Sequence, residues 1–378
     1  MRSSVRRGGA SLVAVTALLS ACGWFGGDKK MSVLTEYAPT AKTAIIWKKS
    51  VGKQSPIGFA PLLQNGVVYS AGVNGQVVAL DAGSGKDLWR FAVKEELSSG
   101  VGAGKDGVYF GTRKGEVVSL DLAGKQKWRS AVSSDILVAP QGVSDVVIVR
   151  TVDGRMVGLN EADGKRRWLQ QRTNPPLVLR NLGSIVSDNG VVFAGMPGGR
   201  LVASKADDGG LLWETLVSQP RGATELERIA DVASAPLLDG ERICAVSYQG
   251  RLACFDTEKG NLDWYREVSS AAGLAMDNRA IFTADSNGVV MAYLKSAGTQ
   301  IWKQEKLKGR KLSGPAVFGN YVIVGDVEGY VHLLGRESGE LTARIATDKS
   351  PIVTAPVATG QGVLVQTEKG NLYAIAIQ

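Results

Sequence analysis

The sequence predicts an all-β fold, an eight-bladed β-propeller of four-stranded antiparallel blades, and two residue series carry that prediction. Tryptophan recurs at intervals of 42, 39, 40, 45, 51 and 38 residues, at Trp47, Trp89, Trp128, Trp168, Trp213, Trp264 and Trp302. A glycine series recurs every 42 residues or so, at Gly75, Gly115, Gly154, Gly199, Gly250, Gly288, Gly329 and Gly370. Short strands repeating at about 42 residues are typical of propeller blades.

Each repeat contains the pattern of strands separated by tight turns. In the first unit, the apolar runs 67–70 and 77–80 flank a turn at Asn74-Gly75, which predicts a β-hairpin. No unit has a 3.6-residue period long enough for a helix pair, which argues against a helical solenoid. Turns that need a positive φ also explain the glycine content, which is 47 of 378 residues, well above average usage of about 7%.

The two ends of the chain are predicted to meet in the last blade. The eighth unit stops after 371–377, its third strand, and the segment 43–48 has the sequence of the missing fourth strand. We therefore expect a propeller over residues 44–378 in which the N-terminal strand completes blade eight. Such closure removes free sheet edges, which otherwise invite aggregation.

Two further positions in the repeat are predicted to be structural. An aspartate or asparagine precedes the turn glycine of the third and fourth strands in several units, at Asp81, Asp121, Asn160 and Asp256. Such a side chain ties a turn by accepting hydrogen bonds from backbone N–H groups. The tryptophans are expected to wedge between neighbouring blades rather than to form a ligand platform. The seventh unit has Ala343 in place of its tryptophan.

The first 21 residues predict a secretory signal peptide, with Arg2, Arg6 and Arg7 before a short apolar run. The run 19–22, Leu-Ser-Ala-Cys, resembles the bacterial lipobox, which implies acylation of Cys22; an ordinary signal is the alternative. Residues 22–43 are then the lipidated N-terminus and a flexible tether. Gly23 after the cysteine implies, by resemblance to lipoprotein sorting, the outer membrane with the protein facing the periplasm.

Composition excludes much catalytic chemistry. His332 is the one histidine of the sequence, so a multi-histidine metal site is excluded, and we expect it to pack within a strand. Removal of the signal lowers the formal net charge from +8 to +5, and no basic run suggests nucleic acid. No cofactor is predicted. Cys244 and Cys254 flank one turn, and in an oxidising compartment they form either a cross-strand disulfide or two buried thiols.

Two long connections between blades predict a binding face. The next turn glycine follows Trp168 by 31 residues and Trp213 by 37, whereas the other connections take 24 to 28. Both flank blade four, on the face that also carries the glycine turns between second and third strands. Insertions in repeat proteins collect on the binding face. The apolar and charged residues of these two connections suit a protein partner. The alternative is that both connections only cover the ends of the blades.

The repeat from Asp81 to Trp89 resembles the PQQ-like, tryptophan-docking propeller repeat. Together with the lipobox and the short tether, it resembles the BamB family, the lipoprotein subunit of the bacterial β-barrel assembly machinery. The segments 177–180 and 223–232 are similar to that family's interblade segments. This resemblance implies that Leu177, Leu179, Arg180 and Asp231 contact the periplasmic POTRA domains of the BamA subunit. Ala233 departs from the family pattern, in which a second acid is common.

The implied function is a non-catalytic scaffold that supports the folding and insertion of outer-membrane proteins, with direct contact to unfolded clients as a further expectation. One alternative is a PQQ-dependent dehydrogenase-like enzyme, whose family shares the repeat but uses a calcium-bound quinone. Another alternative is a periplasmic scaffold of a different envelope complex.

Overall fold

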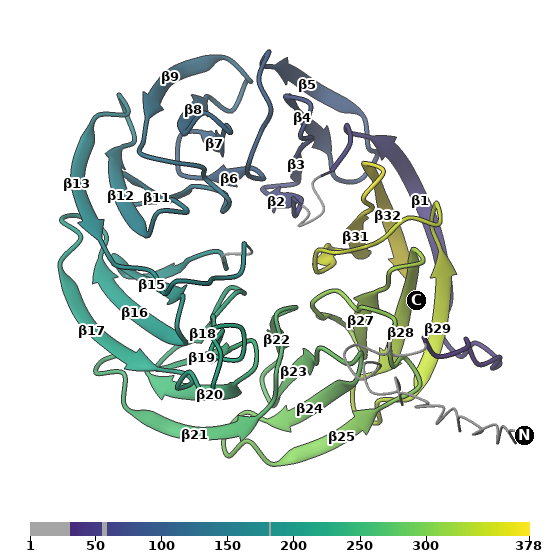
Figure 1. The fold of residues 1–378 in the computed structure, drawn as a ribbon. Coiled ribbons are helices and arrows are strands. Elements are labelled where there is room, and N and C mark those ends of the chain that lie inside the picture. The colour runs from purple at the N-terminus through teal and green to yellow at the C-terminus, as the bar shows by residue number, and fades with distance from the viewer. Residues whose placement is uncertain (1–30, 55–58, 181–182) are drawn as a thin grey trace, which may run out of the picture. The chain divides into compact units, whose positions relative to one another are not determined.

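Eight four-stranded antiparallel sheets form a ring in the part of the chain that the computed structural model describes, residues 31–54, 59–180 and 183–378 (Figure 1). The first strand of each blade, A, lies innermost and the fourth, D, outermost. This arrangement confirms the predicted all-β propeller. Within these ranges no helix is long and apolar enough to cross a membrane.

The strands follow in chain order, blade by blade. Blade one has β2 (Leu62–Gln64), β3 (Val67–Ala71), β4 (Gln76–Asp81) and β5 (Asp87–Ala92); blade two has β6 (Gly102–Ala103), β7 (Val108–Gly111), β8 (Glu116–Leu120) and β9 (Gln126–Ala131); blade three has β10 (Gln141–Val143), β11 (Val146–Arg150), β12 (Arg155–Asn160) and β13 (Arg166–Gln171); blade four has β14 (Val186–Asp188), β15 (Val191–Met196), β16 (Arg200–Lys205) and β17 (Leu211–Leu216). Blade five has β18 (Leu237–Asp239), β19 (Arg242–Val246), β20 (Arg251–Asp256) and β21 (Leu262–Glu267); blade six has β22 (Leu274–Met276), β23 (Ala280–Ala284), β24 (Val290–Leu294) and β25 (Gln300–Gln304); blade seven has β26 (Ala316–Phe318), β27 (Tyr321–Gly325), β28 (Tyr330–Gly335) and β29 (Leu341–Ala346); blade eight has β30 (Val357–Ala358), β31 (Gly362–Gln366), β32 (Asn371–Ile377) and β1 (Thr43–Ser50).

The ring closes as the sequence predicts. Strand β1 pairs antiparallel with β32, from Thr43 opposite Ile377 to Ser50 opposite Asn371. The backbone of Lys42 and Gln378 adds two hydrogen bonds, of 3.1 and 2.9 Å, beyond the last pair. The final strand of blade eight therefore comes from the start of the domain, and its pairing with β32 closes the ring.

The hydrophobic core lies between neighbouring blades, where the two middle strands of each blade are buried on both faces. One cluster joins Phe193 and Leu201 of blade four to Ile243 and Phe255 of blade five, and all four side chains are at most 3% exposed. Residues buried on both faces explain why these strands read as continuous apolar runs rather than as alternating ones.

A tryptophan of strand D docks each of seven blades onto the next, which confirms the predicted wedge. Its indole Nε1 donates to a carbonyl oxygen in the turn between strands C and D of the next blade, as from Trp213 to Thr257 at 2.9 Å. The ring lies against that turn's glycine: a Cβ added to Gly260, whose φ is +72°, would lie 2.7 Å from the Trp213 ring. The same bond forms from Trp47, Trp89, Trp128, Trp168, Trp264 and Trp302.

The eighth interface explains why Ala343 replaces a tryptophan. Blade eight has no covalent turn between strands C and D, because strand C ends the chain and strand D begins the domain. The segment before β1 occupies this place instead: the N–H groups of Thr40 and Ala41 donate to the Thr342 carbonyl oxygen at 2.8 and 3.3 Å. Ala41 and Ala343 are buried in one cluster with Ile377. A tryptophan here would have no turn glycine to receive it.

The polar residue before the turn has the predicted structural role. Asp81 Oδ1 accepts hydrogen bonds from the backbone N–H of Ser84 at 2.8 Å and from its hydroxyl at 2.6 Å. Asp256 accepts from the N–H groups of Lys259 and Asn261 at 2.6 and 2.8 Å. In blades one and five, the turn that receives an indole is thus held by its own carboxylate.

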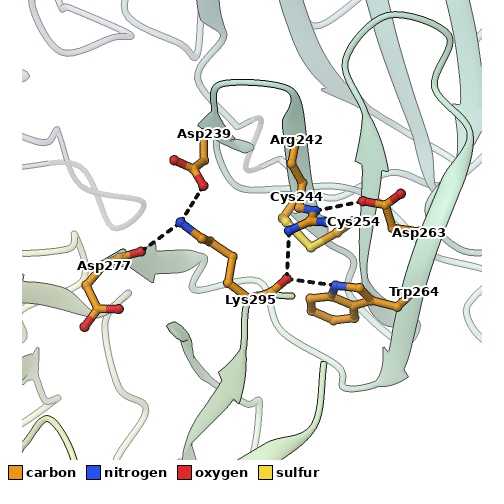
Figure 2. The surroundings of a disulfide bond; sticks show 8 residues. All are labelled: Asp239, Arg242, Cys244, Cys254, Asp263, Trp264, Asp277 and Lys295. Atoms are coloured by element: carbon orange, nitrogen blue, oxygen red, sulfur yellow. Dashed lines mark hydrogen bonds and ion pairs between the residues drawn. A yellow bond between two sulfur atoms is a disulfide. The ribbon is translucent and has the colours of Figure 1, made fainter. Parts of the chain in front are cut away.

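Cys244 in β19 and Cys254 in β20 are directly opposite each other and are joined by a disulfide bond (Figure 2). Both are at most 2% exposed. Polar contacts surround them: Lys295 O accepts from Trp264 Nε1 at 3.0 Å and from Arg242 at 3.2 Å, and Arg242 also contacts Asp263 at 2.7 Å. The disulfide therefore fixes the hairpin of blade five next to its interface with blade six.

Replacement of Trp213 by alanine is predicted to lower the free energy of unfolding by about 3–5 kcal/mol, because it removes a buried aromatic ring. Its hydrogen bond to Thr257 is lost as well. Urea unfolding measures the change. Leu212→Ala is the control, since this neighbour is 44% exposed and should cost well under about 1 kcal/mol. Equal losses for the two variants would contradict the docking role.

Reduction of the disulfide is predicted to lower stability by about 2–3 kcal/mol, the loop-closure value for a short loop. Urea midpoints measured with and without dithiothreitol should differ for the natural chain. The double variant Cys244→Ala/Cys254→Ala should give the same midpoint in both buffers. A natural chain whose midpoint is insensitive to reductant would show that the two thiols are not bridged.

Candidate functional site

The D-to-A connections and the B-to-C turns share one face of the ring, here called the loop face. Each connection begins beside the turn of its own blade: Val93 N donates to Gly75 O at 3.0 Å, and Val217 N donates to Gly199 O at 2.8 Å. This confirms the predicted common face. The C-to-D turns, with their tryptophan-binding glycines, lie on the opposite face, here called the turn face.

The two long connections lie side by side at blade four, as predicted. The first insertion (residues 172–185, described except for 181–182) joins β13 to β14, and the second insertion (residues 217–236) joins β17 to β18. They touch at two points. Leu179 N donates to Asp231 Oδ2 at 2.7 Å, and a Cβ added to Gly183 would lie 2.1 Å from Ser234 O. A glycine at 183 is therefore required for this close approach.

The structure places three of the four predicted contact residues at the surface. Leu177 is 46% exposed, a large value for a leucine. Leu179 is half-buried beside it. The side chain of Arg180 is 71% exposed and lies 3.7 Å from Asp135 in an ion pair. We call Leu177, Leu179 and Arg180 the docking patch.

Asp231 differs from the expectation that it faces a partner, because it is 3% exposed. Its Oδ2 accepts from Leu179 N at 2.7 Å and its Oδ1 from Gly198 N at 2.8 Å. Its carbonyl oxygen accepts from Tyr248 N at 2.9 Å. Hydrogen bonds from two N–H groups to a carboxylate are charge-assisted and therefore strong. Asp231 thus holds the first insertion, the blade-four turn and the blade-five turn together.

Arg150 supports the far end of the first insertion and was not identified from the sequence. It is 4% exposed at the end of β11, and it donates to Gly183 O at 2.6 Å and to Gly195 O at 2.7 Å. Burial lowers its pKa to about 10, so the guanidinium keeps its charge at neutral pH. The sequence does hold one sign of this role. Arg150 ends an apolar second strand, whereas the same position in blades one and two is Ala71 and Gly111.

A cavity of about 720 Å³ opens between the two insertions. Its apolar lining includes Pro175, Met196, Leu216 and Pro220. On one side Arg172 and Arg200 both form ion pairs with Glu214. A smaller hollow lined by Leu179 and Arg180 shares Met196 and Pro197 with this cavity, so the docking patch lies next to it. An apolar centre with a polar rim is common at protein interfaces.

His332 is buried, as predicted, in β28 of blade seven. Its Nε2 lies 2.9 Å from Asp326 Oδ2, which also accepts from Arg310 at 2.6 Å. Burial lowers the pKa of His332 despite the adjacent carboxylate. A fully buried imidazole cannot reach a substrate, so it cannot act as a general base at the surface. Among the described residues no group of three or more His, Cys, Asp or Glu side chains could hold a metal ion.

The centre of the ring does not fit a calcium-bound quinone. The described lining of the central cavity, of about 390 Å³, is formed by small and apolar residues such as Phe59, Val101, Ala139, Leu274 and Val353. It carries no charged side chain in the part of the chain that the structure describes. Calcium sites are built from several oxygen ligands, with carboxylates prominent among them. The lining does not provide them.

Solved structures share this fold. A BamB from Moraxella catarrhalis superposes with a TM-score of 0.82 at 24% sequence identity, covering 89% of this chain and 100% of that one. A quinohemoprotein alcohol dehydrogenase from Comamonas testosteroni superposes with a TM-score of 0.70 at 13% identity, covering 88% and 76%. At these identities both matches establish the propeller alone.

Sequence comparison identifies the family. The family model described as outer membrane protein assembly factor BamB matches residues 30–96, 73–304 and 286–378. The protein of that name from Bordetella pertussis is 40% identical over 373 residues, 98% of this chain and 96% of that protein. The one from Nitrosomonas eutropha is 42% identical over 334 residues, 88% and 82% of the two chains. The chain therefore belongs to the BamB family of outer membrane protein assembly factors.

Proposed function

We propose that this chain is a non-catalytic scaffold of the outer-membrane β-barrel assembly complex, docking through its loop face on periplasmic POTRA domains of BamA. Membership of the BamB family gives it a role in outer-membrane protein assembly. The finer proposal concerns where the partner binds. It rests on the docking patch, a part of the loop face where apolar and charged side chains project together.

The single observation that carries the proposal is the pair of hydrogen bonds to Asp231. They fix the Leu179 backbone to the blade-four turn at 2.7 and 2.8 Å, so Leu177 and Arg180 project from a rigid support. A partner that binds a preorganised loop loses less conformational entropy on association. The exposed Arg180 beside Leu177 and Leu179 is of a residue type that is enriched among interface hot spots.

The anchor of this scaffold is proposed to be the lipid on Cys22. That cysteine and the signal peptide of residues 1–21 lie outside the described residues. Acylation would hold the propeller at the periplasmic side of the outer membrane, where POTRA domains are accessible. The anchor, rather than affinity alone, would then keep the scaffold close to its partner.

Two features of the described residues bear on a catalytic role. His332 is enclosed in blade seven, and the described lining of the central cavity offers no carboxylate. The relatives at 40% and 42% identity are named as assembly factors. No observation favours a quinone enzyme or a different envelope complex.

The charge of Arg180 is predicted to contribute directly to binding. Arg180→Glu should weaken binding of a purified POTRA fragment by about tenfold or more, as at an interface hot spot. Isothermal titration of the two purified proteins measures this. Lys259→Glu is the matched control, since it reverses an exposed charge on the turn face and should leave the affinity unchanged. If Arg180→Glu binds normally, the patch is assigned to the wrong place.

Asp231 is predicted to act through the position of the first insertion. Asp231→Ala should weaken POTRA binding and also speed hydrogen exchange at the Leu179 and Gly198 amides, because both lose their acceptor. Exchange at amides of blade one should not change. Weaker binding with unchanged exchange at Leu179 would mean that Asp231 contacts the partner itself.

A further inference from the structure

The described part of the expected tether is bound to the propeller rather than free. Residues 31–42, here called the strap, follow the outside of blade seven beside β29 (Figure 1). Near the start of the strap, Ser32 donates two hydrogen bonds. Its backbone N–H donates to Lys308 O and its hydroxyl to Lys306 O, both at 2.9 Å. At the other end, Thr40 N donates to Thr342 O at 2.8 Å.

A buried arginine fixes the first end of the strap. Arg310 is 1% exposed, contacts Asp326 Oδ2 at 2.6 Å, and forms an ion pair with Glu328. A third donor, Nη1, reaches the Ser32 carbonyl oxygen at 3.1 Å. Without the strap this buried N–H would lose its acceptor, which is unfavourable. The strap thus completes the hydrogen bonding of a charge inside blade seven.

The strap crosses the blade from the loop face to the turn face. Lys306 and Lys308 belong to the connection between β25 and β26, which lies on the loop face. Midway, Arg344 of β29 lies 5.8 Å from the Tyr37 ring and donates to Thr35 O at 3.4 Å. Thr342, near the start of β29, lies toward the turn face. The described part of the strap therefore begins at Met31, on the loop face.

We propose that the strap presents the loop face of blades six and seven to the phospholipid surface of the membrane. This rests on the proposed lipidation of Cys22. Residues 22–30 are nine in number and reach at most about 30 Å even when fully extended. A chain released from blade seven would instead leave near Thr40, on the turn face, with nine more residues of slack. The strap therefore selects which face lies near the lipid.

The orientation also constrains the partner. The docking patch is on the same loop face, across the ring at blade four. A domain bound there would lie on the membrane side of the propeller, between the blades and the lipid headgroups. The orientation itself needs no partner, so it is tested without one, and a failure of POTRA docking would leave it intact.

The test places one dye on each face of a single blade. Ser286→Cys lies in the B-to-C turn of blade six, on the loop face, and Ser296→Cys lies in its C-to-D turn, on the turn face; both residues are exposed. The two native cysteines of the propeller are buried and bridged, so they do not compete for the dye. The acylated protein is bound to vesicles of phosphatidylethanolamine and phosphatidylglycerol that carry an acceptor dye on the headgroup, and energy transfer is measured.

Transfer from Ser286→Cys should exceed that from Ser296→Cys by about twofold or more, because the two faces are about 20 Å apart along the strands. Adding Ser32→Pro, which removes both donors of Ser32, should shrink this difference. Val33→Pro is the matched control: Val33 is 86% exposed, and the difference should persist. Equal transfer from the two faces, greater transfer from Ser296→Cys, no effect of Ser32→Pro, or failure of the acylated protein to bind vesicles would each overturn the proposal.

Discussion

The contact between an indole and a turn glycine is the interaction on which the ring depends. Each tryptophan of strand D spans the gap to the next blade, where its N–H finds a carbonyl oxygen and its ring finds a residue without a side chain, as Trp213 does at Thr257 and Gly260. The contact fixes the angle between blades, since a flat ring between two sheets leaves little freedom. Seven repetitions bring β1 beside β32, and that closure sets where every loop of the loop face lies.

The fold was predictable because this contact requires particular residue types at particular places. Tryptophan, and a glycine able to adopt a positive φ, have few substitutes there, so their spacing shows the number of blades. The sequence left a disulfide and two buried thiols as alternatives, because Cys244 and Cys254 are opposite only if the turn centres near Gln249, the register that the structure shows. The site was less predictable. The sequence does not show whether an aspartate in a loop faces a partner or, like Asp231, accepts hydrogen bonds from backbone amides within the protein. The strap carries no periodic signal at all, because most of its contacts are to backbone oxygens.

The docking patch depends on two buried charges of opposite sign. Loops that run over blade ends have N–H and C=O groups with no strand to pair with. Asp231 accepts from the N–H groups of Leu179 and Gly198, whereas Arg150 donates to the carbonyl oxygens of Gly183 and Gly195. An apolar side chain at either position would leave those groups buried and unpaired. The first insertion is therefore held in place by two charged side chains that are themselves buried.

The same reasoning connects the eighth interface to the strap. Blade eight is where the chain ends meet, so it lacks the covalent turn that receives an indole at the other interfaces, and Ala343 stands where a tryptophan would be. The strap supplies the missing contact through Thr40 and Ala41, and its other end satisfies Arg310 inside blade seven. Fraying of β1 would also release the end of the strap next to it, at Thr40 and Ala41. Attachment of the strap and closure of the ring are therefore coupled: contacts that hold Ser32 on the loop face also restrain the segment that enters β1, at the joint where the ring is not covalently continuous.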